Sequence, residues 1–152
     1  MIYVIDASVA LKWFVDEGDQ NLALELTKYE TQLLAPDILL AEVANVLRRK
    51  VRGNHIPEVQ AEEAVQILLR TFPKAIASAT LLGDAFAIST QMDHSVYDVL
   101  YLICALRRDD AKLITADAKF AAKCAAAGYG TKILSLEDAH RRLSTGQEND
   151  NG

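Results

Sequence analysis

Four acidic residues stand in apolar stretches of this sequence, where a carboxylate is costly unless something compensates it. Asp6 ends the apolar run of residues 1–5, and Asp117 follows a second short run that begins at residue 112. Glu42 and Asp98 lie in longer apolar stretches with helical periodicity. A hard divalent cation would compensate all of them, since Mg²⁺ and Mn²⁺ prefer carboxylate and water oxygens. The residue types therefore predict a metal site.

Such a site would suit the hydrolysis of a phosphodiester. Clustered carboxylates repel one another, which raises at least one pKa until a metal binds. Bound Mg²⁺ can polarise a phosphodiester, activate a water and stabilise the leaving oxygen. The three histidines, His55, His94 and His140, lack the close spacing of a zinc site. No G-x-S-x-G elbow, Walker loop or G-x-G-x-x-G is present, so acyl transfer, nucleoside triphosphate hydrolysis and dinucleotide chemistry lack their usual markers.

Each acid also has an ordinary structural explanation. Asp6 and Asp117 could cap the helices that follow them, and Glu42 and Asp98 could face solvent or pair with an arginine. Their joint placement at one sheet edge favours the functional interpretation. Three polar neighbours are predicted to support the acids. Ser8 and Thr115 would orient a carboxylate or a water, and the alternative for Ser8 is helix capping. Asn45 would act from the helix of Glu42, and its alternative is a plain exposed position on the helix surface.

The elements that position these acids alternate between strand and helix. This order predicts a three-layer α/β/α fold with a central, mostly parallel sheet of four to five strands. In such sheets ligands bind outside the carboxyl ends of the strands, where Asp6 and Asp117 would lie. Strands are expected near residues 1–5, 33–36, 112–116 and 132–136, with a weaker fifth at 73–78, and helices at 8–15, 20–29, 38–52, 57–72, 81–91, 96–108, 118–127 and 137–143.

Length and composition fit one domain. We expect a single unit over residues 1–143 and a disordered polar tail over residues 144–152. No apolar run is long enough to span a membrane and no leader precedes the first strand, so a cytoplasmic location is expected. Cys104 and Cys124 have no C-x-x-C spacing and are predicted to be buried free thiols.

The net charge of −5 at first argues against a nucleic-acid partner. Setting the four candidate acids aside leaves about as many acidic as basic residues, and a bound metal would reverse the local sign of the site. Arg48, Arg49 and Arg52 end one predicted helix. They are candidates for contacts to an RNA backbone, and the alternative is a favourable interaction with the helix carboxyl terminus.

Four segments of the sequence resemble the motif blocks of PIN-domain nucleases. They are residues 4–14 (VIDASVALKWF), 36–49 (PDILLAEVANVLRR), 97–106 (YDVLYLICAL) and 113–120 (LITADAKF), and in length and spacing they look most like VapC toxins of toxin–antitoxin pairs. The resemblance spans roughly residues 2–140. It implies that Asp6, Glu42, Asp98 and Asp117 form the acidic site, with Asp6 and Asp98 as the Mg²⁺ ligands. It also implies a homodimeric endoribonuclease that a cognate antitoxin silences.

The expected function is therefore a Mg²⁺-dependent endoribonuclease, with Mn²⁺ as a plausible substitute, acting as the toxin of a type II toxin–antitoxin system. RNA is preferred to DNA only because of the resemblance. One alternative is a phosphoaspartate phosphatase or receiver-like protein, although the phosphatase would carry a second acid where this chain has Ser8. The other is a catalytically silent module on the same fold that binds RNA or protein.

Overall fold

A parallel sheet forms the centre of the computed structural model, which describes residues 1–150. The strand order is β2-β1-β3-β4, and every pairing is parallel. The prediction of a central parallel sheet is thus confirmed, with four strands: β1 (Ile2–Ile5), β2 (Leu33–Leu34), β3 (Ala111–Ile114) and β4 (Ile133–Leu134).

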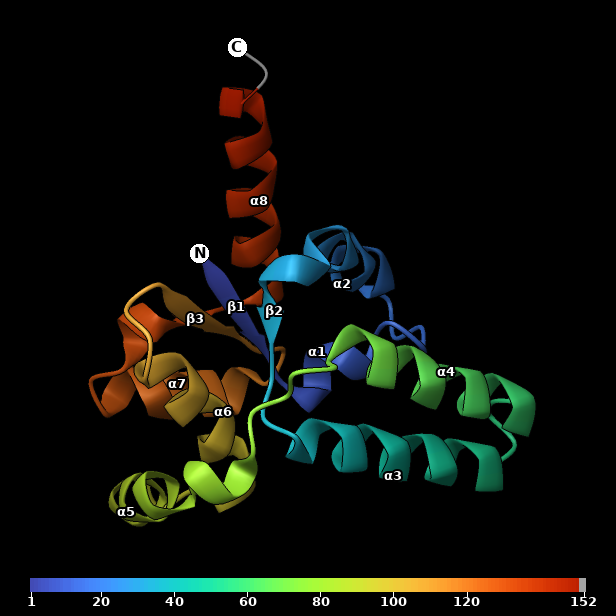
Figure 1. The fold of residues 1–152 in the computed structure, drawn as a ribbon, viewed down its shortest axis with the longest axis horizontal. Helices are drawn as coiled ribbons and strands as arrows, with labels where there is room; N and C mark the ends of the chain where they lie inside the picture. Colours follow the sequence, from blue (N-terminus) through green and yellow to red (C-terminus); the bar gives the residue numbers. More distant parts are fainter. Residues whose placement is uncertain (151–152) are drawn as a thin grey trace.

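Helices cover this sheet, as Figure 1 shows. The helix α6 packs against β1 and β3, whereas α7 and α8 pack against β4. The arrangement is the predicted three-layer α/β fold. The helices are α1 (Ala7–Leu11), α2 (Gln20–Leu26), α3 (Ile38–Arg52), α4 (Glu58–Thr71), α5 (Leu82–Met92), α6 (Val96–Leu106), α7 (Ala118–Ala126) and α8 (Leu136–Asp150), with short 3₁₀ helices at Thr27–Gln32, Ser78–Thr80 and Gly130–Lys132.

The two central strands end at the same edge of the sheet. Ile5 of β1 is paired with Ile114 of β3, so the residues after both strands emerge side by side. The strands are mostly buried because helices lie over them, and seven consecutive residues of α6, Val99–Ala105, are buried as well. Asp98 immediately precedes this buried stretch, so packing of α6 on the sheet determines where its carboxylate lies.

The fifth strand predicted at residues 73–78 does not form. This segment makes a single parallel bridge, between Pro36 and Ile76, with backbone hydrogen bonds from Ile76 N to Ala35 O and from Asp37 N to Ile76 O. Ile76 makes both hydrogen bonds of this bridge, and the bridge stands alone, without a neighbouring pair in the described residues that would extend it into a strand. The weak fifth strand was therefore a wrong prediction.

The ends of two helices also differ from the prediction. The first helix, predicted for residues 8–15, ends at Leu11 and is followed by turns. At the other end of the chain, α8 passes the predicted limit of residue 143 and continues to Asp150. The expected disorder of the polar tail stays a prediction. Ser144 and Thr145 donate hydroxyl hydrogen bonds to carbonyls of the preceding turn, which is compatible with a continuing helix. Residues 151 and 152 of that tail lie outside the described residues.

Two other expectations concern thiols and membranes. Cys104 and Cys124 are buried free cysteines, as predicted. Within residues 1–150, none of the helices combines the length and the apolar character that crossing a membrane would require.

Candidate active site

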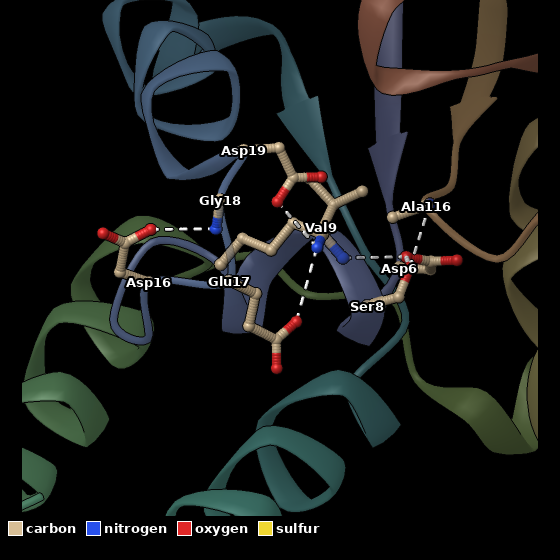
Figure 2. A network of polar contacts seen from close by, with 9 residues as sticks. Asp6, Ser8, Val9, Asp16, Glu17, Gly18, Asp19 and Ala116 are labelled. Carbon is tan, nitrogen blue, oxygen red and sulfur yellow. Dashed lines mark hydrogen bonds and ion pairs between the residues drawn. The ribbon is translucent and has the colours of Figure 1, made fainter.

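Asp6 lies directly after β1, and two hydrogen bonds hold one oxygen of its carboxylate. Oδ1 accepts hydrogen bonds from the Ser8 hydroxyl at 2.5 Å and from the Val9 N–H at 3.1 Å, so Asp6 rather than Ser8 is the N-cap of α1. Ser8 Oγ in turn accepts a hydrogen bond from Ala116 N at 3.0 Å, which ties α1 to the segment after β3 (Figure 2). Ser8 therefore orients Asp6 and joins the two strand ends, and its alternative role as an N-cap was wrong.

Burial makes Asp6 an unusual carboxylate. Its residue is only 7% exposed, and this desolvation raises its pKa to about 6 even though hydrogen bonds from Ser8, Thr115 and Val9 lower it. The negative charge of Asp98 raises the pKa further. A carboxylate that is buried and faces another acid is one that a cation would stabilise.

Glu42 joins this site from α3. It is half-buried, and Oε1 accepts a hydrogen bond from the Tyr101 hydroxyl of α6 at 3.0 Å. Burial raises the pKa of Glu42, the Tyr101 hydrogen bond lowers it, and the charges of Asp98 and Asp6 raise it. Asp6, Glu42 and Asp98 are therefore close enough to act on one another electrostatically, and we call these three residues the acid cluster.

Tyr101 is a residue of the site that the sequence reasoning missed. It is buried, and burial followed by the Glu42 charge raises its pKa, so that its hydroxyl stays protonated and donates. Its only signal in the sequence is an aromatic hydroxyl on a helix that is otherwise almost entirely apolar.

We expect Tyr101→Phe to lower the free energy of unfolding by about 1–2 kcal/mol at neutral pH, because Glu42 loses a donor in a half-buried position. Urea denaturation would measure the change. Tyr97→Phe is the matched control, since Tyr97 is on the same helix with its ring exposed. Equal stability of the two variants would contradict the importance of the Tyr101 hydrogen bond.

Asp98 contributes its carboxylate from the first turn of α6. Oδ2 lies 2.7 Å from Nε2 of His94, and the side chains of His94 and Asp98 are 13% and 37% exposed. The spacing of four residues between them could have indicated this contact, although His94 precedes the helix. Sequence reasoning had considered His94 only as a zinc ligand, so it missed this role as well.

Asp117 is placed differently from the other three acids. It is exposed, and its Oδ1 accepts a hydrogen bond from Phe120 N at 3.0 Å, so it caps α7 as its ordinary explanation proposed. It still lies near the site, because Asp98 and Asp117 both raise the pKa of Cys124, after burial as the larger cause, to about 11. The structure thus brings three acids into the acid cluster and leaves the fourth beside it.

The other polar candidates lie at varying distances from the acid cluster. Thr115 is buried beside Asp6, where its hydroxyl lowers the pKa of Asp6, and its Oγ1 accepts a hydrogen bond from Asp117 N. Asn45 is exposed on α3. Two of the basic candidates, Arg48 and Arg52, lie about 9 and 15 Å beyond Glu42 along the helix axis. They line a groove of about 450 Å³ between α3 and α4, together with Glu58 and Glu62. Arg49 does not line this groove, and all three arginines are exposed.

The acidic turn after α1 is a separate feature. Asp19 and Glu17 both pair with Lys12, at 2.8 and 3.4 Å, and Figure 2 shows these contacts beside the Asp6 network. The Lys12 side chain is mostly buried and balances both charges, so this turn adds neutralised acids rather than further ligands.

The donor chemistry of the acid cluster suits a hard cation, although its side chains do not yet enclose one. Among the described residues, no group of three or more His, Cys, Asp or Glu side chains is arranged to hold a metal ion. The donors do fit, because carboxylate oxygens are the ligands that Mg²⁺ prefers. Burial and neighbouring charges raise the pKa values of two of these carboxylates, Asp6 and Glu42. No thiolate or histidine pair that would favour zinc accompanies them in the described part of the chain.

Comparison with known proteins agrees with this architecture. The family model described as the PIN domain matches residues 3–126. A curated relative, ribonuclease VapC3 of Pyrobaculum aerophilum, is 30% identical over 125 residues, which cover 81% of this chain and 95% of the relative. Ribonuclease VapC1 of Mycobacterium tuberculosis is 31% identical over 121 residues, covering 78% and 88%.

A solved structure has the same fold. The crystal structure of PAE2754 from Pyrobaculum aerophilum superimposes with a TM-score of 0.74 at 19% identity, covering 95% of this chain and 90% of that one. The family match begins in β1, ends with α7 and takes in all four acids. The chain therefore belongs to the PIN-domain family and resembles the VapC ribonucleases within it.

Proposed function

We propose that this protein is a Mg²⁺-dependent endoribonuclease that acts as the toxin of a type II toxin–antitoxin pair. The observation that carries the proposal is the acid cluster at the end of β1, in which burial and mutual repulsion raise the pKa values of Asp6 and Glu42. The names of the relatives, ribonucleases VapC3 and VapC1, support RNA as the substrate.

In this proposal Asp6 and Asp98 would hold the metal, with Mn²⁺ as a substitute, and Glu42 and Asp117 would complete its surroundings or position the attacking water. A bound Mg²⁺ would supply charge stabilisation for the phosphodiester and lower the pKa of a water. The chain's own hydrogen bonds prepare the ligands: Ser8 and Thr115 orient Asp6, and Tyr101 orients Glu42. Asn45 would contribute only indirectly, from the exposed side of α3.

The test is cleavage of a mixed structured RNA by the purified protein, freed of any antitoxin, with Mg²⁺, with Mn²⁺ and with EDTA. We expect cleavage that requires the metal. Intact RNA under every metal condition, from protein shown to be folded, would overturn the proposal and favour a binding module on the same fold.

Arg48, Arg49 and Arg52 are proposed to contact the RNA backbone. Because each phosphate contact releases counterions, alanine at a contacting arginine should weaken RNA binding and reduce the slope of log affinity against log salt by about 1. The measurement is RNA binding over a salt series in EDTA. Arg141→Ala is the control, since Arg141 is exposed on α8 and pairs with Asp138. Unchanged slopes in all three variants would mean that these arginines do not contact RNA and have only a structural role at the end of α3 and in the α3–α4 groove.

The proposed biological partners are a cognate antitoxin and a second copy of the chain. Inducing the protein in bacterial cells should arrest growth, and co-expression of its antitoxin should relieve the arrest. Growth that continues on induction of soluble protein would contradict the toxin assignment without contradicting RNA hydrolysis. Size measurement by light scattering would test the homodimer, and the cytoplasmic location remains a prediction.

A further inference from the structure

The turn before α6 carries a histidine that the proposed reaction does not use directly. His94 Nε2 lies 2.7 Å from Asp98 Oδ2, and the ring stacks on Phe120 of α7 with centroids 4.8 Å apart and planes 22° apart. The same Phe120 donates its N–H to Asp117. A single imidazole thus contacts one acid of the site and packs on the residue whose backbone fixes another.

The position of this imidazole is itself constrained. His94 N donates to Ser89 O at 3.1 Å, and Asp93, in the left-handed conformation at φ 50°, ends α5 just before it. Lys123 of α7 donates to the Asp93 carbonyl, so a second contact holds this turn against α7. The His94 side chain is only 13% exposed. Backbone, stacking and burial together leave the ring little freedom to rotate.

We infer that His94 is a positioning residue that fixes the rotamer of the Asp98 carboxylate, so that Oδ2 is occupied by the imidazole and the other oxygen is presented to the metal. Hydrogen-bond partners of this kind orient metal-ligating side chains, and their loss typically weakens metal affinity about 10- to 100-fold. An imidazole can donate from Nε2 whether neutral or charged, so the role does not require a charged histidine. The inference rests on the proposed role of Asp98 as a metal ligand.

Direct Mn²⁺ titration of the intact protein by calorimetry tests the inference without measuring catalysis. His94→Phe keeps an aromatic ring on Phe120 but removes the donor, and we expect its Mn²⁺ affinity to fall about 10- to 100-fold. His94→Gln offers an amide donor at similar reach and should stay close to the wild type, whereas His94→Met, of similar size without a donor, should bind as weakly as His94→Phe. His55→Phe is the control, since His55 is exposed beyond the far end of α3.

Urea unfolding of every variant in EDTA shows whether a loss of Mn²⁺ affinity is only a loss of folding stability. If His94→Phe is unstable, the comparison of His94→Gln with His94→Met tests the role of the hydrogen-bond donor instead. Equal affinity of these two variants, or no Mn²⁺ binding by the wild type, would overturn the inference. RNA cleavage over a Mn²⁺ series adds a second readout: His94→Phe should need more metal for half-maximal rate but recover at saturation. A wild type that binds Mn²⁺ and cuts no RNA would refute the proposed ribonuclease, while the affinities would still decide the role of His94.

Discussion

Asp6→Asn and Asp98→Asn should each reduce RNA cleavage by about 100- to 1,000-fold, whereas Asp117→Asn should reduce it less. The physical reason is the arrangement of charge: Asp6 and Asp98 act on each other within the acid cluster, and removing either one removes an anionic ligand from the proposed metal site. Asp117 is exposed and already engaged as the cap of α7. Asparagine can still accept that capping hydrogen bond, so Asp117→Asn should fold normally.

Initial rates on one RNA substrate at saturating Mg²⁺ would give this order, with unfolding curves to show that each variant is folded. Asp84→Asn is a suitable control, because Asp84 is a surface acid on α5 paired with Arg107. Equal losses at all three acids would mean that Asp117 is as important as the acid cluster. A full rate with Asp98→Asn would contradict the proposed site altogether.

Asp6→Asn should also make the metal-free protein more stable at neutral pH, by about 2–3 kcal/mol. The pKa of Asp6 is raised from 3.8 to about 6 in the folded protein, mainly by burial. Between these two values the folded protein keeps a proton that the unfolded chain has lost, so the stability of the wild type falls as pH rises from about 4 to about 6. Asparagine avoids this cost because it does not ionise, and it can accept the same hydrogen bonds from Ser8 and Val9.

Urea unfolding in EDTA at pH 4 and at pH 7.5 would measure this effect. The stability advantage of Asp6→Asn over the wild type should grow between the two values, and Mg²⁺ at pH 7.5 should stabilise the wild type more than the variant. Asp138→Asn serves as a control, since Asp138 is an acid on α8 whose side chain is half-exposed and pairs with Arg141. A constant difference between variant and wild type would show that Asp6 titrates normally in the folded protein.

The sequence was sufficient for the sheet and for the acids that belong at its edge. Runs of apolar residues that end on Asp6 and near Asp117 are the mark of strands buried on both faces, and local pattern alone places those acids after the strands. The parallel register, with Ile5 beside Ile114, then brings the strand ends together. Pattern failed where pairing depends on distant partners, as at residues 73–78, and it placed the end of the last helix at residue 143, whereas α8 continues to Asp150.

Only the tertiary structure could decide which side chains meet. Tyr101 of α6 reaches Glu42 of α3 across the fold, a hydrogen bond between residues 59 positions apart. His94 reaches both Asp98 and Phe120 because the turn before α6 lies against α7. Such contacts depend on how helices pack, which periodicity cannot specify. The sequence therefore determined which residues carry the acidic chemistry, and the packing of α3, α6 and α7 determined that three acids share one site while Asp117 caps a helix beside it.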